Sequence, residues 1–197
     1  MLKSFKQVLY ESSLSRIYAQ AKDHESGTIS AFRYARGCGE GETYSKKENL
    51  DRNAVLKAKL LKLGYGVTRI KGTYIENYGT KDAVEVSEES FFVFDKNDKG
   101  TLKNDLVKLG KEFEQDSVTF SKPTGEYYLI GTNKCPNSYP GHGKEIKLGK
   151  PIFGNDGEFH SKINGRPFVF ESIDGRIDEL KNYSISEIRS ITELANL

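Results

Sequence analysis

Apolar side chains recur along this chain with two different periods, which predicts a fold that mixes helices and strands. Spacings of three and four residues predict short amphipathic helices at 3–10 and 14–22. The clearest helix begins at Ser45 and Glu48, which have the spacing of a capping box, and ends at Gly64. Its expected core face consists of Leu50, Ala54, Leu60, Leu61 and Leu63.

Runs of β-branched and aromatic residues predict the strands. They lie at 28–34, 66–75, 90–94, 117–120, 126–131 and 168–170. The run 90–94 is apolar on both faces, which is typical of a central strand. Further helices are expected at 102–113 and from Ser184 onward, and a long loop is expected at 132–156. This order of elements predicts an α+β fold in which helices flank a mixed or mainly antiparallel sheet.

The composition is that of one globular domain. The chain has 197 residues, of which 36% are hydrophobic and 29% are charged, so residues 12–197 are expected to form a single domain. No apolar run approaches the roughly 20 residues that span a bilayer, so no membrane partner is expected. The N-terminus lacks the apolar core of a secretory signal, so the chain is expected to stay in the compartment where it is made.

The cysteines and histidines do not form a recognisable metal or catalytic motif. Cys38 and Cys135 are too few for a disulfide framework and fit a reducing compartment, so a bridge between them is not expected. With His142 and His160 they lack the paired spacing of a zinc site. The glycine-rich segment 37–41 lacks the G-K-[ST] ending of a phosphate loop. Neither a metal nor a cofactor is therefore predicted.

The net charge of +2 hides a segregation of charge along the chain. Residues 44–71 contain eight Lys or Arg against two Asp or Glu, a local charge of +6, whereas residues 76–100 contain three against seven, a local charge of −4. Lys57, Lys59 and Lys62 lie in the basic segment. They are either a solvated helix face or a basic patch that meets phosphate or an acidic partner.

Polar residues at the predicted ends of strands and helices form the candidate site. They are Arg33, Arg52, Asn53, Glu88, Glu89, Lys111, Gln115 and Asp116. Such positions gather at the rim of a sheet, where ligands often bind. In an enzyme that acts on a nucleotide or a nucleic acid, Arg33 and Arg52 would hold phosphate, and Glu88 or Glu89 would act as the acid or base. The alternative is a set of ion pairs and caps that tie the helices to the sheet.

Several segments together resemble a group of uncharacterised proteins of tailed bacteriophages, and more distantly a small bacterial family of unknown function. The matching segments are 28–33, 49–53, 60–66, 88–91, 109–111, 115–117 and 129–132. The similarity extends over about residues 14–171 and implies shared ancestry. It brings no activity with it, so the function has to be argued from the site.

The N-terminus resembles a second group. Residues 1–11 are similar to the capsid-targeting peptides of internal head proteins in T-even-type bacteriophages, which end at a Leu/Ile-x-Glu cleavage site, and Glu11 followed by Ser12 fits that site. The resemblance implies an accessory protein that is packaged in the virion interior, reaches the host cytoplasm and inhibits a host defence protein. The alternatives are an ordinary N-terminal helix, a structural virion component, and the enzyme described above.

Overall fold

The structure is a computed structural model. It describes residues 17–39, 41–76, 81, 84–123, 125–136, 138–149, 151–153, 159–163 and 166–170, with backbone alone at 72–76, 84–87 and beyond residue 149. The helices expected at 3–10 and from Ser184, and the cleavage site at Glu11 and Ser12, lie outside these residues. Residues 17–23 are helical, which agrees with the helix expected at 14–22.

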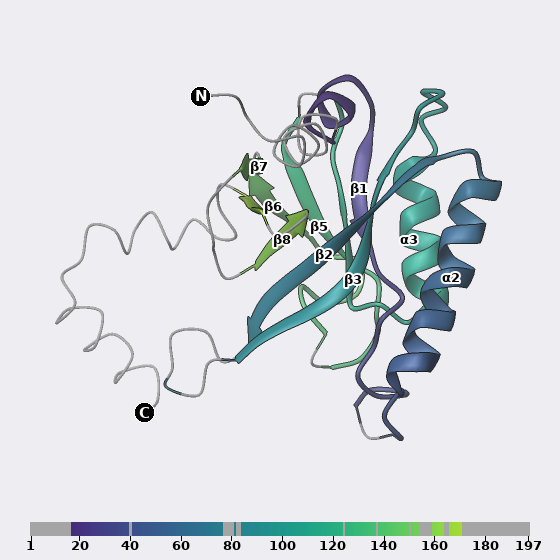
Figure 1. The fold of residues 1–197 in the computed structure, drawn as a ribbon, viewed down its shortest axis with the longest axis vertical. Coiled ribbons are helices and arrows are strands. Elements are labelled where there is room, and N and C mark those ends of the chain that lie inside the picture. Colours follow the sequence, from purple (N-terminus) through teal and green to yellow (C-terminus); the bar gives the residue numbers. More distant parts are fainter. Residues whose placement is uncertain are drawn as a thin grey trace, which may run out of the picture.

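Two antiparallel sheets and two long helices make up the rest of the described fold (Figure 1). The six-stranded sheet has the order β1 (Ser26–Ile29), β3 (Val84–Phe94), β2 (Gly66–Glu76), β8 (Phe159–Ile163), β9 (Arg166–Phe170) and β7 (Pro151–Phe153). The three-stranded sheet consists of β4 (Ser117–Phe120), β5 (Tyr127–Gly131) and β6 (Glu145–Gly149). The helices are α2 (Lys46–Lys62) and α3 (Leu102–Glu112).

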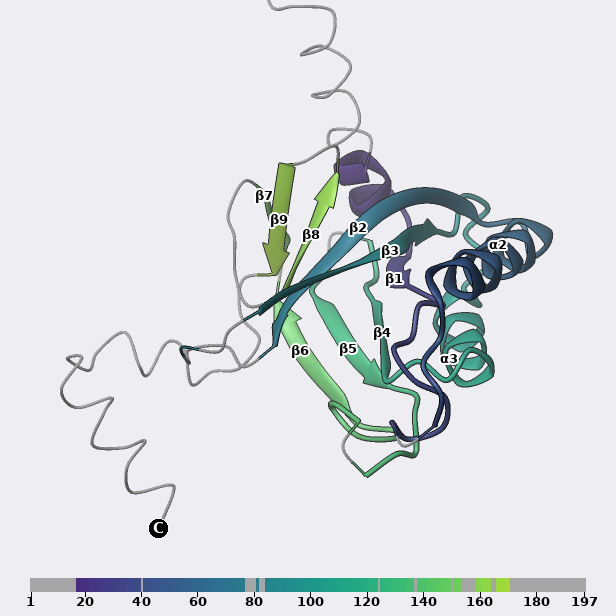
Figure 2. The ribbon, with the colours of Figure 1, turned by 60° about the horizontal axis from the view of Figure 1, so that its bottom comes forward.

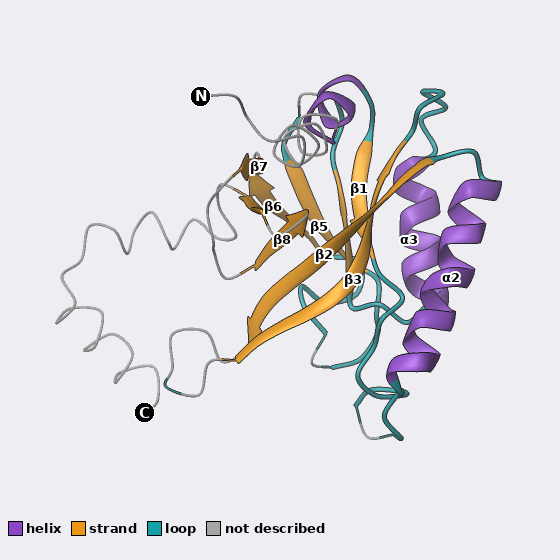
Figure 3. Ribbon diagram, in the orientation of Figure 1, coloured by secondary structure: helices purple, strands orange, loops and turns teal. Residues whose placement is uncertain are grey.

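The predicted α+β class is confirmed. All seven strand pairings in the described residues are antiparallel. Figures 2 and 3 show α2 and α3 side by side on one flank of the strands, and the long β2–β3 hairpin crossing the molecule. No helix in the described part of the chain is long and apolar enough to cross a membrane. The loop expected at 132–156 is shorter than predicted, because β6 pairs with β5 and β7 pairs with β9.

The two sheets meet where β1 and β4 approach each other. Ser26 and Ser121 form an antiparallel bridge, and the Thr28 amide donates to Thr119 Oγ1 at 2.8 Å. Between them, a Cβ atom added at Gly27 would lie 2.1 Å from the Thr119 carbonyl oxygen. A residue without a side chain is therefore required for this close approach.

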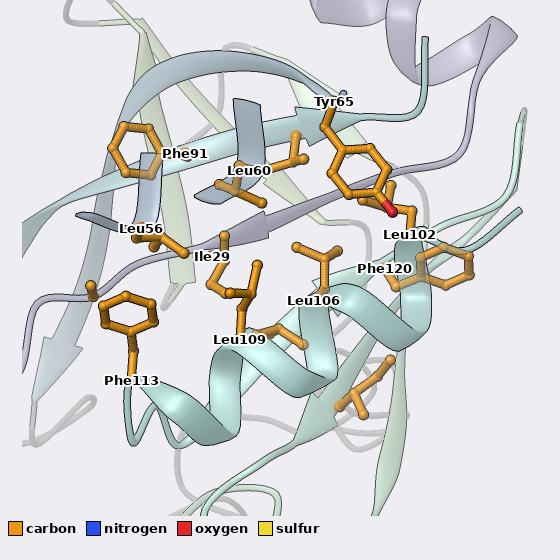
Figure 4. Packing of buried hydrophobic residues seen from close by; sticks show 14 residues of the cluster. Ile29, Leu56, Leu60, Tyr65, Phe91, Leu102, Leu106, Leu109, Phe113 and Phe120 are labelled. Atoms are coloured by element: carbon orange, nitrogen blue, oxygen red, sulfur yellow. The ribbon is translucent and has the colours of Figure 1, made fainter. Parts of the chain in front are cut away.

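The main hydrophobic core lies between the two helices and the sheets. Figure 4 shows Leu56 and Leu60 of α2 facing Ile29 of β1 and Leu106 and Leu109 of α3. Leu56, Leu60 and Leu106 have no exposed surface. This cluster fixes the position of α2 against β1 and β3, which in turn positions the polar side chains of α2.

The predicted core face of α2 is wrong except at Leu60. The residues that are buried are Asn49, Asn53, Leu56 and Leu60, whereas Leu50, Ala54, Leu61 and Leu63 are exposed. The helix begins where the capping box predicted, since the Glu48 amide donates to Ser45 Oγ and the Ser45 amide donates to a Glu48 carboxylate oxygen. The buried face of α2 differs from the predicted face because Asn49 and Asn53 bind backbone groups of the segment that follows β1.

Candidate functional site

Residues 31–34 follow β1 without regular secondary structure, and side chains of α2 bind the backbone of Ala31 and Arg33. Asn53 Oδ1 accepts from the Ala31 amide at 2.8 Å. Asn49 accepts from the Arg33 amide at 2.9 Å and donates to the Arg33 carbonyl at 3.0 Å. The strand expected at 28–34 therefore ends at Ile29, because α2 replaces the neighbouring strand as hydrogen-bond partner.

The guanidinium groups of Arg52 and Arg33 bind backbone carbonyls. Arg52 donates to the Ala31 carbonyl at 2.8 Å, to the Phe113 carbonyl at 2.7 Å and to the Tyr44 hydroxyl at 3.1 Å. Arg33 donates to the carbonyls of Ala35, Gly37 and Glu114. This arrangement gives both arginines a structural role, and phosphate binding by either of them stays a prediction.

Of the three predicted residues near the end of α3, two contact the segment that follows β1 and one points into solvent. Gln115 Nε2 donates to the Phe32 carbonyl at 3.0 Å, and Asp116 lies 3.7 Å from an Arg33 nitrogen. Lys111 is exposed, and its side chain makes no hydrogen bond or ion pair in the part of the chain that the structure describes. We call Asn49, Arg52, Asn53 and Gln115 the clamp, because together they hold residues 31–33.

The two adjacent glutamates of β3 face opposite sides of the sheet. Glu89 lies opposite Lys71 of β2, and Glu88 lies opposite Gly72, so their side chains alternate across the strand. Glu89 is on the face that packs against the helices, as Phe91 is, and its carboxylate lies 3.7 Å from Arg69 Nε. Its side chain is 36% exposed.

The structure brings some of the predicted site residues together and separates others. The structure brings Arg33, Arg52 and Gln115 together, and it connects Glu89 to them because Asn53 Nδ2 donates to the Glu89 carbonyl at 2.8 Å. Glu88 lies on the other face. The contribution of Asn49 was missed, although two asparagines four residues apart on one helix were a signal that this face is polar and buried.

The predicted basic patch is only partly free. Lys59 forms an ion pair with Glu112 at 2.5 Å and so connects α2 to α3. Lys57 and Lys62 are exposed and make no ion pair among the described residues. The patch that remains available to a phosphate or an acidic partner is therefore smaller than the sequence indicated.

The expectation about the cysteines is wrong. Cys38 and Cys135 form a disulfide with a Cα–Cα distance of 5.3 Å. The pairing depends on the fold. Arg33 binds the carbonyl of Gly37, which precedes Cys38, and Asn133, two residues before Cys135, donates to a carboxylate oxygen of Asp116. These contacts hold the two cysteine loops near the chain that follows α3. The bridge joins two loops that are 97 residues apart in sequence and lie beside the clamp.

A separate carboxylate oxygen lies buried just before β1. Glu25 Oε2 is buried and has no hydrogen-bond partner in the described residues. Burial raises the pKa of Glu25 above its ordinary value of 4.5, and the negative charge of the fully buried Asp95 raises it further. The protonated form is therefore favoured by folding, and its stabilising contribution is lost as the pH rises through the folded-state pKa.

We expect Glu25→Gln to raise the melting temperature at pH 7, because glutamine has no charge to bury. The gain should disappear below about pH 4.5, where the glutamate is protonated in both states. Thermal melts between pH 3 and pH 8 check this result. Glu126→Gln, at a partly exposed ion pair with Lys147, serves as the control and should change stability little. A gain that is the same at every pH would contradict the explanation.

Comparison with known proteins identifies the family. A family model described as the S-adenosylmethionine lyase family matches residues 27–187. The match covers well over half of the chain and includes the clamp, both glutamates of β3 and both cysteines. No curated protein matches the sequence. On the strength of the family match, the chain belongs to the S-adenosylmethionine lyase family.

Proposed function

We propose that this protein is an enzyme that cleaves S-adenosylmethionine. The observation that carries the proposal is the family match over residues 27–187. The substrate is a nucleoside joined through a sulfonium cation to an amino acid, so the proposal keeps the expectation of an enzyme but differs from the sequence-based alternative, which was an enzyme that acts on a nucleotide or a nucleic acid. S-Adenosylmethionine contains no phosphate, and the engagement of Arg33 and Arg52 by backbone carbonyls is compatible with such a substrate.

The chemistry of a sulfonium gives a carboxylate two tasks. A carboxylate attracts the cation in a site that is shielded from water. When a C–S bond breaks, the sulfur keeps the electron pair and leaves as a neutral thioether, and the other fragment releases a proton when it eliminates. A carboxylate within hydrogen-bond reach of that proton can accept it.

Glu89 is our candidate for this base. Its side chain is partly exposed, and its backbone carbonyl accepts hydrogen bonds from Ser30 and Asn53 at 2.9 and 2.8 Å. Glu88 is the alternative candidate, and it lies on the opposite face of β3. Because the two side chains point away from each other, a single site on one face contains only one of them.

Two isosteric variants test the function and the choice of base. Glu89→Gln should lower kcat for S-adenosylmethionine by about 10²–10⁴-fold, the usual contribution of a general base. Glu88→Gln changes the neighbouring residue in the same way on the other face. Chromatography of the substrate and its products measures the rate, and thermal melts show that both variants are folded. Full activity of Glu89→Gln would show that Glu89 is not the base. A wild-type protein that leaves S-adenosylmethionine intact would refute the proposed function.

The N-terminal sequence supports a further proposal about where the protein works. Residues 1–11 and the site between Glu11 and Ser12 suggest a bacteriophage accessory protein that is delivered from the virion interior to the host cytoplasm and counteracts a host defence protein. An enzyme can be delivered in this way, so the two proposals are compatible. Mass spectrometry of purified virions, which identifies the protein and its first residue, tests the second one.

A further inference from the structure

On the side of β1, the backbone at Glu89 has no strand partner, although it still pairs with Lys71 of β2 on the other side. β1 pairs with β3 from Ser26 opposite Phe94 to Ile29 opposite Phe91, and the ladder ends there. The Glu89 carbonyl therefore lies just beyond the last pair. A carbonyl at the end of a ladder needs another donor if it is shielded from water.

Two side chains supply those donors. Ser30 Oγ donates to the Glu89 carbonyl at 2.9 Å, and Asn53 Nδ2 donates to it at 2.8 Å. Asn53 is 3% exposed, and its Oδ1 accepts from the Ala31 amide at 2.8 Å. The Asn53 amide thus joins the chain that continues β1 to β3 and ties both of them to α2.

We propose that Asn53, assisted by Ser30, is a positioning residue that sets where the Glu89 carboxylate lies relative to the substrate. The inference rests on the proposed function. A carboxylate can accept a proton only from a restricted geometry, and a displacement of about 1 Å can cost about 10²-fold in rate. Asn53 does not touch the substrate in this proposal and acts only through the β3 backbone.

Asn49 provides a matched control on the same helix. It lies one turn before Asn53, is 7% exposed, and also makes two hydrogen bonds to the segment after β1. Those bonds go to the backbone of Arg33, and none of them reaches β3. Asn49→Ala and Asn53→Ala therefore remove the same number of side-chain hydrogen bonds, but only the second variant releases Glu89.

The experiment measures kcat and KM for S-adenosylmethionine in both variants, at a temperature at which circular dichroism shows each to be folded. Asn53→Ala should lower kcat by about 10–100-fold with KM changed less than about 3-fold, whereas Asn49→Ala should leave kcat within about 3-fold of wild type. Equal losses of kcat in the two variants would overturn the inference. If Asn53→Ala does not fold, Ser30→Ala takes its place, and an unchanged kcat in that variant would overturn the inference.

A second measurement separates this inference from the proposed function. The carboxyl carbon signal of Glu89 can be assigned by NMR, because Glu89→Gln removes it. Asn53→Ala should shift that signal and Asn49→Ala should not, whether or not the protein cleaves S-adenosylmethionine. Absence of cleavage by the wild type would refute the proposed function, and identical Glu89 signals in both asparagine variants would refute the positioning role.

Discussion

Replacing Leu56 with alanine should lower the free energy of unfolding by about 3–5 kcal/mol, the range for a leucine removed from a tightly packed core. Leu56 has no exposed surface, and it packs in the cluster that joins α2 to α3 and β1. Removing its side chain leaves a cavity that the surrounding side chains cannot fill without moving. Urea denaturation monitored by circular dichroism gives the free energy directly.

Leu61, five residues further along the same helix, is the control. Its side chain is 52% exposed, so Leu61→Ala should change stability by no more than about 0.5 kcal/mol. The comparison keeps the residue type, the helix and its propensity constant, and changes only burial. A loss at Leu61 as large as the loss at Leu56 would contradict the observed orientation of α2 and restore the one expected from the sequence.

Reducing the disulfide between Cys38 and Cys135 should lower the free energy of unfolding by about 4–5 kcal/mol. The bridge closes a loop over a sequence separation of 97 residues, and a cross-link of that span removes much of the conformational entropy of the unfolded chain. For a chain of this length, the expected decrease in melting temperature is about 10 °C. Thermal melts with and without dithiothreitol measure it.

The double variant Cys38→Ser with Cys135→Ser shows whether the reductant acts through this bridge. Its melting temperature should match that of the reduced wild type and should not respond to dithiothreitol. A wild-type protein whose melting temperature is unaffected by the reductant would mean that the bridge does not stabilise the fold. A double variant that still responds would mean that the reductant acts elsewhere.

Local sequence signals determined where several elements begin and end. The capping box at Ser45 correctly predicted the start of α2. The apolar spacing predicted α3 with one residue too many at its C-terminal end, and the predicted strand at 117–120 coincides with β4. These signals act between residues that are no more than about four positions apart, so they can be recognised without knowledge of the tertiary contacts. The α+β class followed from the same information.

Only the tertiary structure decided which face of α2 is buried and which polar residues work together. Asn53 bonds to Ala31 and to Glu89, which are 22 and 36 residues away, and the disulfide joins residues 97 apart. A pattern of hydrophobic residues favoured the leucine face of α2, but unpaired backbone groups after β1 and at Glu89 required the asparagine face instead. Glu88 and Glu89 were both predicted from the sequence as site residues, but the register of β2 and β3 places their side chains on opposite sides of the sheet. The cost of leaving buried hydrogen-bonding groups unpaired depends on which segments meet, and that information is absent from any short stretch of the chain.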